Sequence, residues 1–349
     1  MEIVDVLAND AFSMVTMTEA IATAPTQPRE LKNSGIFVQE PIRTEMAVIE
    51  FREGKLEIAP LDERGATYSS SSDEPRKIRH FKTKRVARHK RLTASDLAFV
   101  RQFGSNETQI VEELQKEIAR WQTGGGGLID QCENRLELMR LGALNGLLLD
   151  QEGRTVYDFH AEFGITAPPK VFLDIANTSE FQLRKKVESK ITRTMRRKAK
   201  GRFVGEVKAL CGEAAWDALM ANAEFNKRYE AAADAKMAGK LTEGTLGTEV
   251  SFAGVTWKEY FGADDGSSIN LAPAEIKFFP GKGSNIFRHM LSPGETFDDL
   301  AQQGREWYSY LVPDREFPSP RWVDLYVAQY PMIVNTAPDL VFPASSAAS

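Results

Sequence analysis

The sequence is poor in the residues that build disulfides, metal sites and membrane spans. It has two cysteines, Cys132 and Cys211, and four histidines among 349 residues. Two cysteines do not make a disulfide framework, and such sparse use fits a reducing compartment. No run of about 18 apolar residues occurs, which excludes an ordinary membrane-spanning helix. The first residues also lack the basic and apolar parts of a signal peptide. We therefore expect a cytoplasmic protein with no membrane partner.

Reactive motifs are absent as well. Residues 160–162 match the opening of a zinc-deaminase signature, but the cysteine pair that completes it is missing. Residues 281–284 lack the full frame of a phosphate-binding loop, and no nucleophile elbow occurs. Cys211 has no base beside it in the sequence, so we interpret it as a buried structural thiol. We expect no enzyme, no metal site and no cofactor.

The formal net charge of −5 hides an uneven distribution of charge. Residues 76–91 contain nine Lys or Arg and no acid, and residues 184–202 contain ten Lys or Arg and one acid, Glu188. The rest of the chain has 25 basic and 48 acidic residues. A chain that is basic in two segments and acidic elsewhere can attract other copies of itself.

The two basic segments have three interpretations: they form solvated faces, pair with acidic residues of another copy, or bind nucleic acid. Nucleic-acid binders are usually basic overall and carry aromatic residues among the basic ones, whereas this chain is acidic and these segments have few aromatics. For a contact between copies, we predict Arg79, Lys82, Arg85 and Arg88 on one side and Glu112, Glu113 and Glu117 on the other.

One long amphipathic helix is predicted over residues 128–149. Its apolar residues recur at spacings of three and four, which places them on one face; they are Ile129, Cys132, Leu136, Met139, Ala143 and Leu147. Arg135, Glu137 and Arg140 fall largely off that face. Turn residues at 150–153 end the helix, and nothing on it is reactive. A shorter helix is predicted before it, over residues 106–121, with Asn106 as its cap.

Alternating patterns predict strands elsewhere. Residues 42–50 and 51–58 suggest a hairpin across a Glu-Gly turn, and the basic strand 76–91 then returns, so residues 45–92 form a long two-stranded extension. Such a ribbon is barely stable alone, so we expect it to lie on another surface. Residues 155–163 alternate as one strand. Residues 178–240 are rich in helix, and further strands are expected at 249–257, 276–279 and 322–330. The fold class is α+β.

Short sequence pieces, spread in order over nearly the whole chain, resemble the major capsid protein E family of tailed bacteriophages, which includes the lambda head protein. The pieces include Asp10-Ala11-Phe12, Gly35-Ile36-Phe37, Gly54-Lys55-Leu56, Glu133-Asn134-Arg135, Leu141-Gly142-Ala143-Leu144-Asn145-Gly146, Ala209-Leu210-Cys211-Gly212, Phe252-Ala253-Gly254-Val255-Thr256-Trp257 and Phe278-Phe279-Pro280. No single piece is specific, but their order and spacing are.

The resemblance implies the Hong Kong 97 type of capsid fold. It divides the chain into an N-terminal arm (1–35), an extended loop with its flanking strands (36–99), a peripheral domain with a long spine helix (100–174), an axial domain (175–290), and a return through both domains to a C-terminal tail (291–349). The function it implies is a major capsid protein that self-assembles into the icosahedral head shell around a double-stranded DNA genome, in the host bacterial cytoplasm.

The same resemblance implies the partners: further copies in hexamers and pentamers, a portal protein, a scaffold protein, a decoration protein in some heads, and DNA held by enclosure without sequence-specific contacts. Gly124, Gly125, Gly126 and Gly127 stand before the spine helix. Because glycine restricts the backbone least, they are either a hinge for shell expansion or a plain surface loop. The alternatives for the whole chain are an encapsulin-like compartment shell and a nucleic-acid-binding protein.

Overall fold

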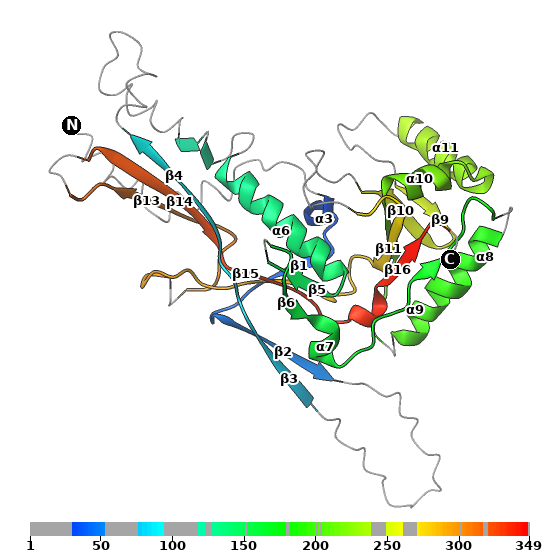
Figure 1. Cartoon of the computed structure of the whole chain (residues 1–349), viewed down its shortest axis with the longest axis horizontal. Coiled ribbons are helices and arrows are strands. Elements are labelled where there is room, and N and C mark those ends of the chain that lie inside the picture. The colour runs from blue at the N-terminus through cyan, green and yellow to red at the C-terminus, as the bar shows by residue number, and fades with distance from the viewer. Residues whose placement is uncertain are drawn as a thin grey trace, which may run out of the picture.

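A computed structural model describes residues 30–52, 76–93, 118–119, 121–122, 127–150, 152–178, 182–199, 202, 204–238, 249–260, 271–299, 302–316 and 320–347. Helices and sheets are mixed along the chain, which confirms the α+β class. In Figure 1 a lobe of helices packed on a sheet lies to the right of α6 (Leu128–Leu144), and a narrow sheet extends to the left. A two-stranded ribbon projects at the bottom of the view.

The helix-rich lobe is built on a six-stranded mixed sheet. Its strands in spatial order are β7 (Val171–Phe172), β16 (Phe342–Ser345), β11 (Glu275–Pro280), β8 (Val207–Cys211), β10 (Val255–Glu259) and β9 (Val250–Phe252). The helices are α8 (Gln182–Val187), the π-helical turn η2 (Glu188–Thr192), α9 (Arg193–Lys198), α10 (Glu213–Met220) and α11 (Ala223–Ala238). Phe225, Trp257 and Phe278 are fully buried there and pack edge to face, which is the favoured geometry for aromatic pairs. We name this the six-strand core.

A second core surrounds α6. Ile129, Cys132, Leu136, Met139 and Ala143 are all buried there, so the predicted apolar face of the helix is confirmed. Around it lie the sheet of β4 (Val86–Thr93), β14 (Trp322–Gln329) and β13 (Tyr308–Pro313), the hairpin of β5 (Leu147–Leu149) and β6 (Thr155–Asp158), and the short helix α7 (Phe159–Phe163). We name this the α6 core.

A third sheet joins the two cores. It consists of β1 (Phe37–Pro41), β12 (Phe287–Leu291) and β15 (Pro331–Asn335). Along β12, Phe287 belongs to the six-strand core and Met290 to the α6 core. The short helix α3 (Glu30–Asn33) precedes β1, and the 3-10 turn η3 (Pro338–Leu340) leads from β15 toward β16. A single strand therefore passes from one core into the other.

The long helix is shorter than its pattern predicts. α6 ends at Leu144, and Leu147–Leu149 pair with β6 as strand β5. Gly146 adopts a left-handed φ of +75°, and a Cβ there would lie 2.4 Å from Nε2 of His160. Only glycine fits both conditions, so the helix must stop before it. The prediction of a helix over residues 128–149 is wrong in its last turn.

The strand predicted over residues 155–163 is also only half right. Its second half is α7, because the Asp158 carboxylate accepts hydrogen bonds from the backbone N–H groups of His160 and Ala161 and so caps a helix. Gly164, with a left-handed φ of +64°, ends that helix.

The two-stranded extension is confirmed in part. β2 (Met46–Arg52) pairs antiparallel with β3 (Arg76–Lys82) as the projecting ribbon. The basic strand 76–91, however, does not continue along β2. It breaks after Lys82, and β4 instead forms a ladder with β14 from Val86↔Gln329 to Thr93↔Trp322. That ladder buries Leu92, which the ribbon could not do. The predicted turn within residues 51–58 lies mostly outside the described residues.

Candidate assembly surfaces and the junction at α6

The ribbon has one face against the body. Directly opposed residues of an antiparallel pair share a face, and Ala47, paired with Phe81, is fully buried, as is Phe81 itself. The Phe81 ring lies 5.3 Å from that of Tyr157 and 6.0 Å from those of Phe159 and Phe163. These contacts hold the base of the ribbon on α7 and β6.

The other face of the ribbon is apolar and open. Met46 is 46% exposed, Val48 54% and Ile78 52%. Val48 pairs with His80 and Met46 with Lys82, so basic side chains alternate with the apolar ones across this face. Clustered exposed apolar side chains rimmed by charge are typical of a protein contact. We name Met46, Val48 and Ile78 the outer ribbon face.

The predicted basic contact residues lie on β3, on β4 and between them. Arg79 donates to the Glu162 carbonyl oxygen at 2.7 Å, and Arg85 pairs with Glu295 at 2.8 Å. Lys82 and Arg88 are exposed. No described carboxylate forms an ion pair with either of them. The predicted acidic partners Glu112, Glu113 and Glu117 lie outside the described residues, so the pairing stays a prediction.

Two surface features escape a reading of the sequence. Arg91, the last basic residue of its segment, forms a bidentate pair with Asp324 of β14 at 2.8 Å, and the charge pattern alone does not reveal a partner 233 residues away. Phe297 is 94% exposed. Its loop is anchored because the Asp299 carboxylate accepts from the Tyr310 hydroxyl at 2.8 Å. A large aromatic on an anchored loop is typical of a contact residue.

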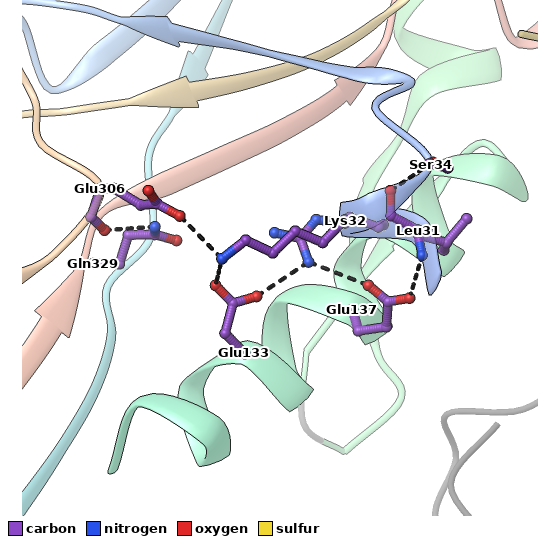
Figure 2. Close-up of polar contacts among 8 residues, drawn as sticks. Leu31, Lys32, Ser34, Glu133, Glu137, Glu306 and Gln329 are labelled. Atoms are coloured by element: carbon purple, nitrogen blue, oxygen red, sulfur yellow. Dashed lines mark hydrogen bonds and ion pairs between the residues drawn. The ribbon is translucent and has the colours of Figure 1, made fainter. Parts of the chain in front are cut away.

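A buried network of charged side chains joins α3, α6 and the segment before β13. Lys32 of α3 reaches Glu133 at 2.8 Å and Glu306 at 3.1 Å (Figure 2). Arg140 reaches Glu133 at 3.3 Å and Glu137 at 3.2 Å. The second oxygen of Glu137 accepts the backbone N–H of Leu31 at 2.7 Å. Three carboxylates and two cations therefore satisfy one another; Glu133, Glu137 and Arg140 are buried, and Lys32 and Glu306 are partly exposed.

Burial sets the electrostatics of this network. It raises the pKa of Glu137, although Arg140 and the Leu31 N–H oppose the shift. For Lys32, burial alone would lower the pKa, but Glu133 and Glu306 outweigh it and raise the value. His289 of β12 is fully buried nearby, and burial, helped by Arg140 and Lys32, lowers its pKa to about 3. We therefore expect His289 to be neutral at physiological pH.

The network corrects the prediction that Glu137 and Arg140 fall largely off the buried face of the helix. Arg140 is 2% exposed and Glu137 3%, whereas the pattern placed both largely off the buried face. Glu133, Glu137 and Arg140 follow one another at steps of four and three, the spacing of a single helix face. That stripe is the one sequence signal that could have indicated them. Lys32 and Glu306, the remaining members of the network, lie far from α6 in the sequence, and no sequence pattern indicates that they take part.

The same network ties the two cores together through α3. The Leu31 side chain is buried in the six-strand core, and Glu30 pairs with Lys258 of β10 at 2.5 Å. The next residue, Lys32, binds the opposite partner, α6. α3 is thus fixed to both cores.

The remaining candidates lie as follows. Cys132 and Cys211 are both buried and free. Burial raises the pKa of the Cys132 thiol to about 12 and raises that of Cys211 as well. Among the predicted hinge glycines, Gly127 caps α6 with an ordinary φ of −60°, while Gly124, Gly125 and Gly126 lie outside the described residues. Across the described part of the chain, no helix combines the length and apolar character needed to cross a membrane.

The ribbon, the α6 core and the helix-covered six-stranded sheet define the capsid fold of the Hong Kong 97 type. A crystal structure of a protein assigned as a prophage capsid protein of E. coli CFT073 has this fold, with a TM-score of 0.53 and 11% identity over 92% of this chain and 93% of that one. The cyanophage P-SCSP1u capsid has a TM-score of 0.49 and 8% identity over 94% and 90% of the two chains. For the holo-SrpI encapsulin complex of Synechococcus elongatus PCC 7942, the TM-score is 0.43 and the identity 12% over 95% and 94%.

The family model for phage major capsid protein E matches residues 13–345. The chain therefore belongs to that family. It is a major capsid protein, a structural subunit of the icosahedral head shell of a bacteriophage. No curated protein matches it.

Proposed function

We propose that copies of this chain associate into hexamers and pentamers that close into a head shell around double-stranded DNA, and that they do so in the host bacterial cytoplasm. The observation that carries this proposal is the outer ribbon face, which is apolar, open and presented on a projecting element. A closed shell requires such a surface to meet a neighbour.

The ribbon supplies a modest contact that is repeated many times. Full burial of one aliphatic side chain is worth roughly 1.5–3 kcal/mol, so the half-exposed Met46, Val48 and Ile78 each have about 1 kcal/mol left to gain on association. Ordering costs take part of that gain. Many weak contacts acting together nevertheless hold a shell firmly.

We propose a second, electrostatic contact between neighbours. Its basic side is Arg79, Lys82, Arg85 and Arg88, and its acidic side is Glu112, Glu113 and Glu117 of the next copy. Because Arg79 and Arg85 already have partners within the chain, Lys82 and Arg88 bring most of the unpaired charge. Such exposed pairs are screened by salt, so this contact is strongest at low ionic strength.

The domain limits 1–35, 36–99, 100–174, 175–290 and 291–349 are part of the proposal, as are a scaffold protein, a portal protein and a decoration protein as further partners. The packaged DNA is held by enclosure. The predominantly acidic remainder of the chain supports this, since an acidic wall does not retain DNA.

A hinge at Gly124, Gly125, Gly126 and Gly127 is proposed for shell expansion. The Gly125→Ala/Gly126→Ala variant should expand more slowly or not at all, because alanine restricts the backbone where glycine does not. Expansion of procapsids is followed by light scattering and negative-stain microscopy. Expansion at the normal rate would leave these glycines as a plain loop.

The ribbon contact has a direct test. In the Val48→Thr/Ile78→Thr variant the strands keep β-branched residues, but the outer face loses apolar surface worth about 2 kcal/mol per contact. We expect the concentration needed for particles to rise at least about tenfold. Negative-stain microscopy of purified chain over a dilution series measures this.

The matched control is Val48→Ile/Ile78→Val, which keeps the face apolar and should assemble like the parent. The free energy of thermal unfolding of the unassembled chain should differ from the parent value by no more than about 0.5 kcal/mol in both variants, because Val48 and Ile78 are half exposed in the single chain. Unchanged assembly of the threonine variant would contradict the ribbon contact. Particles that enclose a protein cargo in place of DNA would favour the encapsulin-like alternative.

A further inference from the structure

We propose that a groove beside β7 binds an extended, acidic segment of another protein, which adds to the open edge of that strand. The groove has a volume of about 620 Å³. It lies between β7 and the helical turns of η2 and α9, and its lining includes Lys170, Val171, Phe172, Ser189, Lys190 and Thr194. The inference goes beyond the proposed shell function and does not depend on it, because all of these residues belong to one chain.

The edge of β7 is open for pairing. β7 is the outermost strand of the six-stranded sheet, and its one neighbour in the described structure is β16. The backbone N–H of Leu173 donates to the Ser345 carbonyl oxygen at 3.0 Å. Because the backbone groups of successive residues point to opposite sides of a strand, the N–H and C=O groups of Lys170 and Phe172 point away from β16. Such an edge is where an extended peptide adds as a further strand.

The open edge is short, which limits the partner to a short segment. Pro168 and Pro169 stand directly before β7, and proline has no N–H to donate to a ladder. At the other end, Asp174 has a left-handed φ of +47°, so the chain leaves the strand there. Residues 170–173 are therefore the part of the edge with which a partner strand can pair.

The groove is basic. Lys170 on the β7 side and Lys190 on the η2 side are both exposed, and no carboxylate of the described residues forms an ion pair with either. Nζ of Lys170 lies 5.8 Å from the centre of the Phe172 ring, and Phe172 is 40% exposed. Asp174 also lines the groove, but its carboxylate already accepts from the Asn177 side-chain amide at 2.9 Å. The two lysines thus favour an acidic partner.

The helix that forms one side of the groove carries more positive charge. Its buried residues recur at strict steps of four: Leu183, Val187, Ile191, Met195 and Ala199. An α-helix has 3.6 residues per turn, so the wider π turn η2 keeps this row on the core. Ser189, Arg193 and Arg197 follow the same step and are exposed, and neither arginine has an ion-pair partner among the described residues. They continue the basic side of the groove along the helix.

A peptide fits these features better than a nucleic acid. A strand edge offers N–H and C=O groups at the spacing of another peptide backbone, whereas a phosphodiester backbone has no N–H donors for the carbonyl groups. The chain is also acidic overall, with a formal net charge of −5, unlike most nucleic-acid binders. The structure thus favours a segment of a few residues with an extended backbone and acidic side chains.

Binding to the unassembled full-length chain tests the groove. The probe is a fluorescent octapeptide of alternating Glu and Val, and its titration is followed by fluorescence anisotropy. We expect saturable binding that Lys170→Gln/Lys190→Gln weakens at least about tenfold, because two charge-assisted contacts are lost. The matched control, Lys227→Gln/Lys282→Gln, removes the same charge from exposed positions outside the groove and should bind like the parent.

Strand addition has a test of its own, in which the charge is unchanged. Phe172→Pro removes the N–H that points to the open edge, a substitution that edge strands tolerate, while Phe172→Val keeps this N–H and suits a strand. We expect Phe172→Pro to bind at least about fivefold more weakly than Phe172→Val. A probe of alternating Glu and Pro, which cannot form a ladder, should also bind the parent weakly, and it provides the test if Phe172→Pro does not fold.

Three results would overturn the inference. Failure of the Glu–Val probe to bind would leave Lys170 as a charge that protects an edge strand from pairing. Equal affinity for the Glu–Val and Glu–Pro probes would exclude strand addition. A short DNA duplex that binds more tightly than the Glu–Val probe, and loses affinity in Lys170→Gln/Lys190→Gln, would assign the groove to nucleic acid. Because these measurements need no particles, their failure would leave the shell function intact.

Discussion

Arg140→Met should destabilise the unassembled chain strongly. Arg140 is 2% exposed and is paired with both Glu133 and Glu137, which are 1% and 3% exposed. Methionine is apolar and helix-forming, but it leaves Glu137 without its cation and Glu133 with Lys32 alone. Breaking a buried pair by removing one partner typically costs 3–5 kcal/mol. We expect a loss of about 4 kcal/mol in the free energy of unfolding.

The matched control removes the whole charge group. In Glu133→Gln/Glu137→Gln/Arg140→Met, the amide oxygens can still accept from Lys32 and from the Leu31 N–H, which are bound at 2.8 Å and 2.7 Å in the parent. Lys32 also keeps Glu306. Because no uncompensated charge is left inside, this triple variant should recover most of the loss.

Urea unfolding followed by tryptophan fluorescence measures both variants. Trp307 is buried in the α6 core, and Trp216 and Trp257 are buried in the six-strand core, so the signal reports on both cores. Far-UV circular dichroism follows the helix and strand content of the whole chain in parallel. If the free energy of unfolding of Arg140→Met lies within 1 kcal/mol of the parent value, the network does not stabilise the fold. If the triple variant is as unstable as Arg140→Met, packing rather than charge explains the loss.

Two further predictions concern pH and salt. The pKa of His289 is about 3 in the folded chain and about 6.5 when unfolded, so the unfolded state binds more protons between these values, and stability is lost as the pH falls below 6.5. From pH 7 to pH 5 the loss in the free energy of unfolding is about 2 kcal/mol. Urea titrations at both pH values should show no such loss for His289→Asn. An equal dependence on pH in this variant would refute His289 as the titrating group. Glu137 has a raised pKa and acts in the opposite sense, but it is present in both chains. Arg85→Glu/Arg88→Glu should weaken assembly more at low salt than at high salt. The control is Arg85→Glu/Glu295→Arg, which preserves the ion pair within the chain. If the light-scattering curves of Arg85→Glu/Arg88→Glu and the parent coincide at all salt concentrations, the electrostatic contact is excluded.

Local pattern was enough for the class and for much of the architecture. The spacing of Ile129, Cys132, Leu136, Met139 and Ala143 predicts the buried face of α6, because helix periodicity and burial are both local properties. The strands at β9, β10, β11 and β14 follow from alternation and turn residues in the same way. The order of short motifs indicates the capsid family over nearly the whole chain, which the family match confirms.

The tertiary structure decided what depends on distant partners. Leu147–Leu149 are good helix formers, and only the ladder with β6 and the contact of Gly146 with His160 turn them into a strand. β4 leaves the ribbon and pairs instead with β14, more than 200 residues later, where Arg91 also binds Asp324.

From the sequence alone, Glu137 and Arg140 have the pattern of a solvated helix face. The N–H of Leu31, about a hundred residues earlier, binds Glu137, and Arg140 pairs with Glu137 and with Glu133, which Lys32 also binds. A charge enters a protein interior only where partners compensate it, and the positions of those partners are a property of the folded chain.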